Sequence, residues 1–330
     1  MADIIDGSHW PPWVCPEHSL PLAYQTGALV CSRGHEFPCR NDIPRFAAPS
    51  YSEAFGLQWN VYRKTQLDSY TGTTITQDRI HRVLGDTIFA GLEDKQVLEC
   101  GCGAGRFTET RLAQGARVTS IDMSTAVEAN VKNFPQSQAH RAAQADIQSL
   151  PFAPQQYDLV LALGVIQHMP SPEDAVAALY SHVKPGGYLV LDHYTYNMSW
   201  YTKSAPIFRS IIRKLPSHRA LAITQRIVDR LLPWHRRATR ISGVLQIMLS
   251  RLSPVQCYYT TYPQLNDKLQ REWALLDTFD SLTTLHHHFR TRGGVHRMLE
   301  RLGMTSIRTK YDGNGVEACG KRPIQVGHER

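Results

Sequence analysis

The sequence has no apolar run long enough to cross a lipid bilayer. Its longest such run, residues 159–166, is far shorter than the roughly 20 residues that a membrane-spanning helix needs. The first ten residues include Asp3 and Asp6 and have no apolar core, so we expect no secretory signal peptide. No internal repeat is present either. These absences favour a globular protein over a membrane or repeat protein.

Acidic residues are fewer than basic ones, since 36 Lys and Arg against 29 Asp and Glu give a formal charge of +7. This balance favours an anionic partner without identifying it. The seven cysteines are an odd number, and Cys100 and Cys102 lie in a glycine-rich turn. We therefore expect a reducing, cytoplasmic compartment rather than a disulfide scaffold. The length of 330 residues allows one large domain with appended modules.

The most informative stretch is residues 97–107, where a short apolar strand runs into alternating glycines and then into a helical pattern. Glycines let the backbone approach a ligand closely, and a helix N-terminus offers free N–H groups. A dinucleotide fingerprint would need its third glycine one place later, so the spacing disfavours an NAD oxidoreductase. The candidate binding residues of this stretch are Glu99, Gly101, Gly103, Gly105 and Arg106.

Alternating strands and helices follow this turn. The predicted strand at 117–121 ends in Asp122, whose carboxylate can accept hydrogen bonds from both hydroxyls of a ribose. The neighbouring Met123 can pack on an adenine ring. A third strand is predicted at 140–145, and the predicted strand at 157–165 is rich in apolar residues, as a strand buried on both faces of a parallel sheet is.

This succession resembles motifs I to VI of class I S-adenosylmethionine-dependent methyltransferases of the type 11-like group, whose first motif is E/D-x-G-x-G-x-G. The resemblance implies S-adenosylmethionine as cofactor. It also implies that Asp146 accepts a hydrogen bond from the adenine amine, that Ile147 donates its backbone N–H, and that Gly164 lies at the cofactor. His168, just past the fourth strand, is the candidate catalytic residue, with a structural histidine as the alternative.

The fold class that we predict is α/β, with a doubly wound, mostly parallel, seven-stranded Rossmann-like sheet. After a turn at 184–187 and a fifth strand, the last helix at 294–302 leads into an antiparallel hairpin that closes the sheet. We expect the methyltransferase core to comprise residues 96–193 and 293–323.

Residues 1–50 contain two pairs of metal-ligating residues on either side of a short hairpin-like stretch. Zinc prefers four Cys or His ligands in a tetrahedron, and a segment this small buries little core without a metal. It resembles the zinc ribbon at the front of some methyltransferases, including large-subunit rRNA guanine methyltransferases, with His18 in place of the usual second cysteine. Cys39 could replace a histidine, and scattered loop residues are the alternative. The candidate ligands are Cys15, His18, Cys31 and His35.

Residues 51–95 form a connector in which Phe55, Trp59 and Tyr62 share one helical face. This face either packs on the core or forms a lid over the cofactor. The segment resembles one in uncharacterised bacterial methyltransferases that have F-G-x-Q-W before motif I. We expect the helix that leads into the sheet to span residues 77–90.

Residues 194–292 are predicted to form an inserted helical cap that determines substrate specificity. Its stretch 207–240 is rich in arginine and contains the single acid Asp229. Three interpretations of these arginines are open. They form a solvated basic face, they bind an anionic acceptor, or they contact an anionic membrane surface. The stretch 273–280 again resembles those bacterial methyltransferases. Adjacent histidines at 286–288 point in different directions, so we do not expect a metal there.

Together these features favour a cytoplasmic methyltransferase that uses S-adenosylmethionine and a small-molecule, lipid-linked or glycan-linked acceptor, most simply an anionic one. An rRNA or tRNA methyltransferase is less favoured, because no basic run with stackable aromatics lies near the ribbon-like segment. A non-catalytic partner that keeps the cofactor fold is the remaining alternative.

Overall fold

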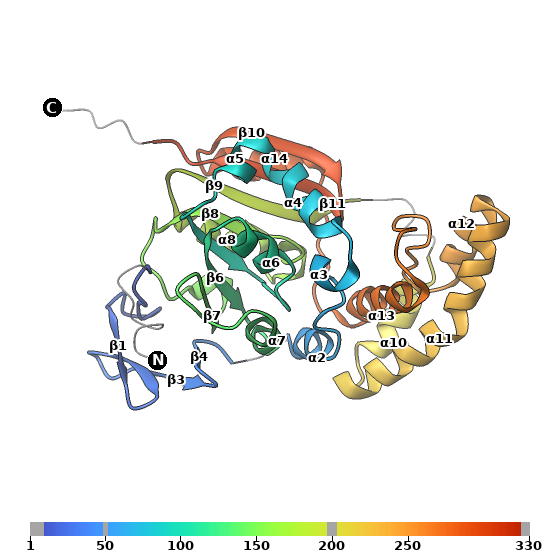
Figure 1. Cartoon of the computed structure of the whole chain (residues 1–330), viewed down its shortest axis with the longest axis horizontal. Helices are drawn as coiled ribbons and strands as arrows, with labels where there is room; N and C mark the ends of the chain where they lie inside the picture. The colour runs from blue at the N-terminus through green and yellow to red at the C-terminus, as the bar shows by residue number, and fades with distance from the viewer. Residues whose placement is uncertain (1–9, 49–51, 197–202, 325–330) are drawn as a thin grey trace.

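The structure is a computed structural model and describes residues 10–48, 52–196 and 203–324. A central sheet has helices on both faces, a small N-terminal sheet lies at one end, and a helical lobe lies at the other (Figure 1). The candidate site is formed where the central sheet meets the helical lobe.

The central sheet has seven strands in the order β10-β11-β9-β8-β5-β6-β7. Strands β5 to β9 pair in parallel, whereas β11 pairs antiparallel with both β9 and β10. The predicted doubly wound sheet with a closing antiparallel hairpin is therefore confirmed. The strands are β5 (Gln96–Cys100), β6 (Arg117–Asp122), β7 (His140–Gln144), β8 (Tyr157–Ala162), β9 (Val183–Tyr194), β10 (Thr305–Asp312) and β11 (Gly315–Lys321).

Alternating apolar side chains of the central strands build a hydrophobic core on each face of the sheet. Leu98 and Val160 are register partners and belong to one core, while Val97 and Leu159 are partners in the other. Because both faces are covered by helices, apolar residues predominate on both faces of β5 and β8. The covering helices are α4 (Ile75–Leu84), α5 (Asp86–Ala90), α6 (Arg106–Ala113), α7 (Ala126–Asn133), α8 (Pro172–Ser181) and α14 (Arg292–Arg301).

Some element bounds differ from those predicted. The single helix expected at 77–90 is two helices, α4 and α5, because Gly85 between them has a φ of 74° and a ψ of 164°. The Arg308 guanidinium lies 2.7 Å from the place of a Cβ at Gly85, so the break also makes room for that side chain. Strand β9 begins at Val183 and therefore includes the expected turn at 184–187.

The N-terminal segment forms a four-stranded antiparallel sheet that is docked onto the core. Phe46 N donates to Gln144 O at 2.7 Å, which continues the edge of the central sheet beyond β7. The Trp13 ring stacks on Phe152 at 5.1 Å, and both belong to one core cluster with Leu98. The strands are β1 (Leu22–Gln25), β2 (Ala28–Cys31), β3 (Glu36–Arg40) and β4 (Ile43–Pro44).

A fully buried arginine joins this segment to the central sheet. The Arg141 guanidinium lies 4.4 Å from the ring centroid of Trp13 and 5.2 Å from that of Phe152. Its Nε donates to Thr119 Oγ1 at 3.1 Å, and its Nη2 donates to Tyr157 OH at 3.3 Å. Burial lowers the pKa of Arg141, and the aromatic faces partly offset the loss of hydration. The ribbon-like segment thus shares its interior with the core.

The residues inserted after β9 form the helical lobe, as predicted. Its helix α13 contacts α10, α11 and α2, so the lobe also rests on the connector. No helix among the described residues combines the length and apolarity that a membrane span requires. The lobe helices are α10 (Ala205–Ile212), α11 (Ser217–Ile241), α12 (Gly243–Leu252) and α13 (Asp267–Thr283), and the remaining connector helices are α2 (Glu53–Val61) and α3 (Asp68–Thr71).

Replacing Trp13 tests how firmly the N-terminal segment is docked. We expect Trp13→Ala to lower the free energy of unfolding by about 3–5 kcal/mol, because a buried aromatic ring is lost beneath Arg141. The matched control is Trp234→Ala on α11, where the side chain is 57% exposed, with an expected cost of about 1 kcal/mol or less. Urea titration measures both, and equal costs would contradict the docking.

Candidate active site

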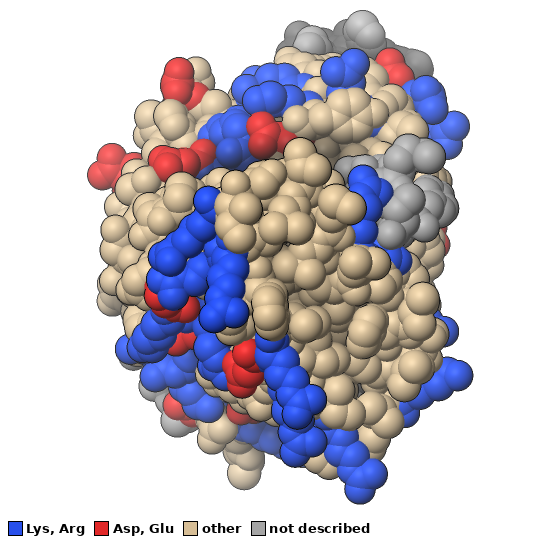
Figure 2. Space-filling model, turned by 90° about the vertical axis from the view of Figure 1, so that its right-hand side faces the viewer, with Lys and Arg blue, Asp and Glu red and all other residues tan. Residues whose placement is uncertain are grey.

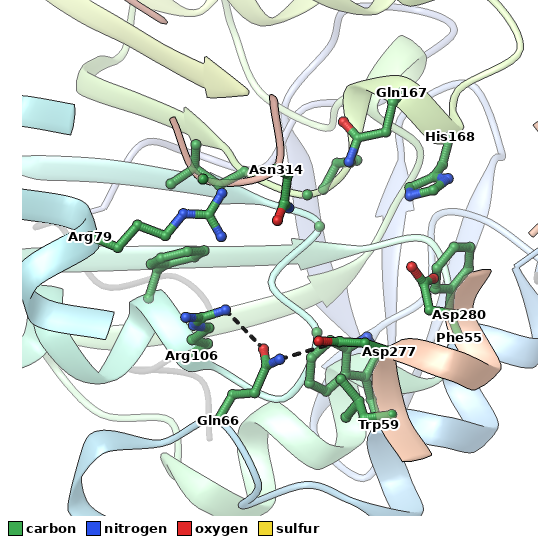
Figure 3. Close-up of a pocket in the computed structure, with 18 of the residues that line it drawn as sticks. Phe55, Trp59, Gln66, Arg79, Arg106, Gln167, His168, Asp277, Asp280 and Asn314 are labelled. Atoms are coloured by element: carbon green, nitrogen blue, oxygen red, sulfur yellow. Dashed lines mark hydrogen bonds between the residues drawn. The ribbon is translucent and has the colours of Figure 1, made fainter. Parts of the chain in front are cut away.

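A cavity of about 810 Å³ lies between the carboxyl ends of the central strands and the helical lobe. It is located where β5 lies between β6 and β8, the point at which the strand order reverses. Ligands of open α/β sheets bind at this position because loops from neighbouring strands diverge there. Figure 3 shows the side chains that α2, α13 and the strand ends direct into the cavity.

Most of the residues predicted from the sequence to bind the cofactor come together in this cavity. Glu99 and Gly105 are the exceptions and do not line it. The candidate catalytic residue His168 lines it as well. The predicted residues that line the cavity are Gly101, Gly103, Arg106, Asp122, Met123, Asp146, Ile147, Gly164 and His168.

The glycine turn requires glycine for both conformational and steric reasons. Gly101 and Gly103 have φ values of 71° and 52°, in the left-handed region that other residues rarely adopt. A Cβ at Gly101 would lie 2.1 Å from Val165 Cγ2, and one at Gly103 would lie 3.0 Å from Trp59 Cε2. A side chain at either position would therefore displace the walls of the cavity.

The carboxylate of Asp122 fixes this turn from the end of β6. Its Oδ2 accepts a hydrogen bond from Gly103 N at 2.9 Å. Its Oδ1 accepts from Ser124 N at 2.8 Å and from Ser124 Oγ at 2.6 Å. Burial raises the pKa of Asp122 although these donors act to lower it. A carboxylate has about four acceptor positions, so Asp122 retains capacity toward the cavity.

Glu99 lies beneath the turn rather than in the cavity. It is only 2% exposed, and its Oε2 accepts a hydrogen bond from Thr108 Oγ1 at 2.7 Å. Burial raises the pKa of Glu99 to about 8. Gly105 is also a packing position, since a Cβ there would lie 2.6 Å from the Phe134 ring. In this structure both residues support the turn from behind.

Arg106 extends across the cavity from the start of α6. Its Nε donates to Thr76 Oγ1 at 3.0 Å, and its Nη1 donates to Gln66 Oε1 at 3.1 Å. The guanidinium lies 5.4 Å from the ring centroids of both Phe107 and Trp273. Burial lowers the pKa of Arg106 to about 10, so it remains charged at neutral pH. It is a fixed positive charge on one wall of the cavity.

A second buried arginine, Arg79, lines the cavity near Arg106, and its guanidinium lies 5.8 Å from the centroid of the same Phe107 ring. Arg79 Nη2 lies 2.6 Å from Asp192 Oδ2, and its Nε lies 3.2 Å from Glu317 Oε1. The other Asp192 oxygen, Oδ1, accepts a hydrogen bond from Gly164 N at 2.6 Å. This network joins α4, β9 and β11 and fixes the backbone after β8. The sequence analysis did not identify it, because its members are far apart in the chain.

The helical lobe contributes two carboxylates, Asp277 and Asp280, that sequence reasoning missed (Figure 3). Asp277 Oδ2 accepts a hydrogen bond from Tyr258 OH, and its Oδ1 accepts from Gln66 Nε2 at 3.5 Å. Asp280 Oδ1 is buried and has no hydrogen-bond partner. Acids three residues apart, within the apolar stretch 273–280 of α13, are the signal that could have revealed them.

Burial changes the protonation of both carboxylates. It raises the pKa of Asp277 to about 6 and that of Asp280 to about 7, and the Arg209 guanidinium acts in the opposite direction on Asp280. The neighbouring Asp280 also raises the pKa of Asp277, while Tyr258 acts to lower it. A carboxylate with a pKa near 7 can accept a proton at neutral pH and release it later.

His168 lines the cavity on the same side as Asp280 (Figure 3). Its Nδ1 lies 3.2 Å from the carbonyl oxygen of His286, which makes Nδ1 the donor and Nε2 the acceptor. The ring contacts Tyr194 at 5.3 Å and Phe55 at 5.6 Å between centroids. Burial lowers the pKa of His168 to about 4. The imidazole is therefore neutral at pH 7 and a weaker base than Asp280.

The aromatic face of α2 is divided between two environments. Phe55 and Trp59 line the cavity, as Figure 3 shows. Tyr62 instead packs into the helical lobe, where its OH accepts a hydrogen bond from Gln225 Nε2 at 2.9 Å. The stripe thus covers the glycine turn and joins the connector to the lobe, which combines both interpretations of it.

The arginines of the lobe do not reach the cavity. The arginines of the stretch 207–240, including Arg226 and Arg230, are all absent from its walls. Among the described residues of the lobe, Lys203, before α10, is the only cation that lines it. That the cap arginines bind an anionic acceptor stays a prediction, and in the structure they lie outside the cavity walls. Arg226, Arg230 and Arg237 are exposed on α11, whereas Arg209 on α10 is partly buried and its Nε donates to Thr284 O at 3.2 Å.

The N-terminal sheet brings together the predicted metal ligands. Cys15 Sγ lies 3.7 Å from His18 Nδ1 and 3.8 Å from His35 Nδ1. Cys31 Sγ lies 3.5 Å from the same His18 nitrogen. Within the described parts of the chain, Cys15, His18 and His35 are the one group of at least three such residues whose ligand atoms are all within 4.8 Å of one another.

Comparison with known proteins gives a match over the centre of the chain. Residues 98–191 match the family model described as "Methyltransferase domain". The ubiquinone biosynthesis O-methyltransferase of Pseudomonas savastanoi pv. phaseolicola is 33% identical over 129 residues, which cover 38% of this chain and 56% of that protein. That of Shewanella pealeana is 30% identical over 145 residues, covering 40% and 57% respectively. The chain thus spans about half the length of the curated relatives it matches.

Among solved structures, the chain is similar to an O-methyltransferase family protein from Burkholderia thailandensis. The sequence identity is 11% and the TM-score is 0.42, and the aligned region covers 78% of this chain and 60% of that one.

Proposed function

We propose that this chain, whose residues 98–191 match the methyltransferase-domain family, transfers a methyl group from S-adenosylmethionine to a small-molecule acceptor. The observation that carries the proposal is the Asp122–Gly103 hydrogen bond at the mouth of the cavity. It places a carboxylate and a glycine turn side by side at the carboxyl edge of a parallel sheet, where a nucleoside would bind.

The walls of the cavity fit such a cofactor. Asp122 would accept hydrogen bonds from the ribose hydroxyls, and Met123 would pack against the adenine. Asp146 and the Ile147 backbone would recognise the adenine edge at the end of β7. A Cβ at Gly164 would meet nothing within 4 Å, so the backbone beside it is open to a ligand. Arg106 would provide a positive charge for a carboxylate of the cofactor.

Methyl transfer requires little covalent help from the protein, because the sulfonium methyl is electrophilic when the cofactor is bound. The chain's own residues would position the acceptor in line, exclude water and take up a proton. We assign the base to Asp280 rather than His168, because the pKa of Asp280 is about 7 and its Oδ1 is unpartnered. It would receive the acceptor's proton as the acceptor atom bonds the methyl carbon and the sulfur retains its electrons. His168 would position the acceptor.

The acceptor that fits these groups is a small molecule with a hydroxyl. Asp277 and Asp280 face the cavity and the lobe arginines do not, which favours a proton-donating group over an anionic one near α13. The relatives named as ubiquinone biosynthesis O-methyltransferases support oxygen as the methylated atom.

Calorimetry with S-adenosylmethionine tests the cofactor assignment. We expect Asp122→Ala and Gly103→Val each to weaken binding by about 1–3 kcal/mol, the scale of a lost buried hydrogen bond. The matched control is Asp158→Ala, because Asp158 also accepts a backbone hydrogen bond, from Gln96 N at 2.9 Å, but does not line the cavity. Unchanged affinity in both cavity variants would refute the assignment.

The pH dependence of turnover tests the base. With an acceptor in hand, kcat should rise with pH and level off above about 7, because only ionised Asp280 accepts a proton. Asp280→Asn should lower kcat about 10²- to 10⁴-fold and remove this rise, with cofactor affinity retained. The control is Asp267→Asn at the exposed start of α13, where the carboxylate pairs with Arg236. A wild-type pH profile in Asp280→Asn would exclude this role.

We also propose that the N-terminal cluster holds one structural zinc ion. Zinc bonds of about 2.3 Å to sulfur and about 2.0–2.1 Å to nitrogen place tetrahedral ligand atoms about 3.5 Å apart. The separations of Cys15 Sγ from His18 and His35 and of Cys31 Sγ from His18, which are 3.5–3.8 Å, match that figure, and Cys15, His18 and His35 form the tighter group. The soft sulfur and imidazole donors are those that zinc prefers. The ion would cross-link the loops at 15–18 and 31–35.

Elemental analysis of protein purified without chelator tests this proposal. We expect about one zinc per chain, and we expect Cys15→Ser or Cys31→Ser to release it. Cys39→Ser is the matched control, because Cys39 lies on β3 outside the cluster. The zinc content of this variant should equal that of wild type. Zinc-free wild-type protein would end the proposal.

A further inference from the structure

Helix α12 has its apolar side facing outward. The side chains of Val244, Ile247, Met248 and Leu252 are 57–77% exposed. The residue that α12 buries is instead a polar one, Gln246, whose Nε2 lies 3.1 Å from the imidazole Nδ1 of His235. This arrangement is the reverse of a normal surface helix, which buries its apolar stripe.

The apolar surface continues onto the adjoining helices. Ile207 and Ile211 on α10 are 68% and 62% exposed, and Ile241 at the end of α11 is 74% exposed. Ser204, at the start of α10, donates to the carbonyl oxygens of Arg251 and Leu252, so the two helices meet. We call the exposed apolar residues of α10, α12 and Ile241 the outer lobe face. Contiguous exposed apolar surface of this kind marks an interaction site.

Basic side chains border the outer lobe face. Figure 2 faces this side of the molecule and shows a broad uncharged area flanked by Lys and Arg, with few acids. Arg226, Arg230 and Arg237 are exposed along α11, and none forms an ion pair among the described residues. The one acid of the stretch 207–240, Asp229, is paired with Arg271.

We propose that the outer lobe face docks onto an anionic lipid bilayer. Its apolar side chains would enter the boundary between headgroups and acyl chains, and the flanking arginines would contact lipid phosphates, as in membrane-surface helices. A second copy of the same face fits less well, because a twofold interface would bring the same positive borders together. The net charge of +7 acts in the same direction.

The outer lobe face also lies beside the cavity. Two residues next to the contact between α10 and α12 line the cavity. Lys203 directly precedes Ser204, and Gln256 follows the end of α12 by four residues. Docking would therefore set one side of the cavity against the bilayer. The docking itself does not depend on the methyl transfer proposed above, and its test requires neither cofactor nor acceptor.

Vesicle co-sedimentation of the full chain tests the docking. We expect wild type to sediment with vesicles of equal parts phosphatidylcholine and phosphatidylglycerol, more weakly at high salt, and not with phosphatidylcholine alone. The triple variant Val244→Gln, Ile247→Gln, Met248→Gln should lose binding more than tenfold. Arg226→Glu with Arg230→Glu should do the same, since each cation at an anionic surface contributes about fivefold.

The chain offers matched controls for both variants. Arg297→Glu with Arg301→Glu reverses two arginines of the same spacing on α14 and should bind vesicles as wild type does. Val61→Gln changes an apolar residue that is 49% exposed outside the face and should also bind normally. Circular dichroism confirms that each variant is folded. Absence of wild-type binding to anionic vesicles would overturn the proposal. It would also be overturned if wild type formed a dimer that the triple α12 variant converts to a monomer and neither protein bound vesicles.

Discussion

The hydrogen bonds that Asp122 accepts from Gly103 N and from Ser124 determine the geometry of the whole site. They hold a left-handed glycine turn at the end of β5 against the end of β6. This glycine turn packs between the buried Glu99 beneath it and the Trp59 ring above it. The backbone N–H groups of the turn themselves hold it, since Gly101 N and Cys102 N both donate to Ile121 O and Gly105 N donates to Cys102 O.

The helical lobe forms the side of the cavity that the central sheet leaves open. By covering the carboxyl edge of the sheet, α13 buries Asp277 and Asp280 and raises the pKa of each toward neutrality. The hydrogen bonds from Arg106 to Gln66 and from Gln66 to Asp277 connect the cofactor wall with these acids (Figure 3). The proposed division of labour is therefore spatial: the sheet holds the cofactor, and the lobe handles the proton and the acceptor.

The sequence was a reliable guide wherever local patterns decide the structure. The glycine turn, Asp122 and the closing hairpin follow from short-range periodicity, and the structure has them where expected. Contacts between segments that are far apart in the chain could not be predicted from such local patterns. Asp280 enters the cavity because α13 folds back over the sheet, and no local pattern shows which lobe arginines are exposed, as Arg226 is, and which are partly buried, as Arg209 is. The guanidinium that fills the space beside Gly85 comes from Arg308, which is more than two hundred residues away in the chain.

A crystal structure with S-adenosylhomocysteine, the demethylated form of the cofactor, tests the central claim most directly. We expect the ribose hydroxyls on Asp122, the adenine edge at Asp146 and Ile147, and the sulfur facing the part of the cavity that contains Asp280 and His168. A nucleoside bound away from the Gly103 turn would contradict the proposed site, and so would a sulfur directed away from α13.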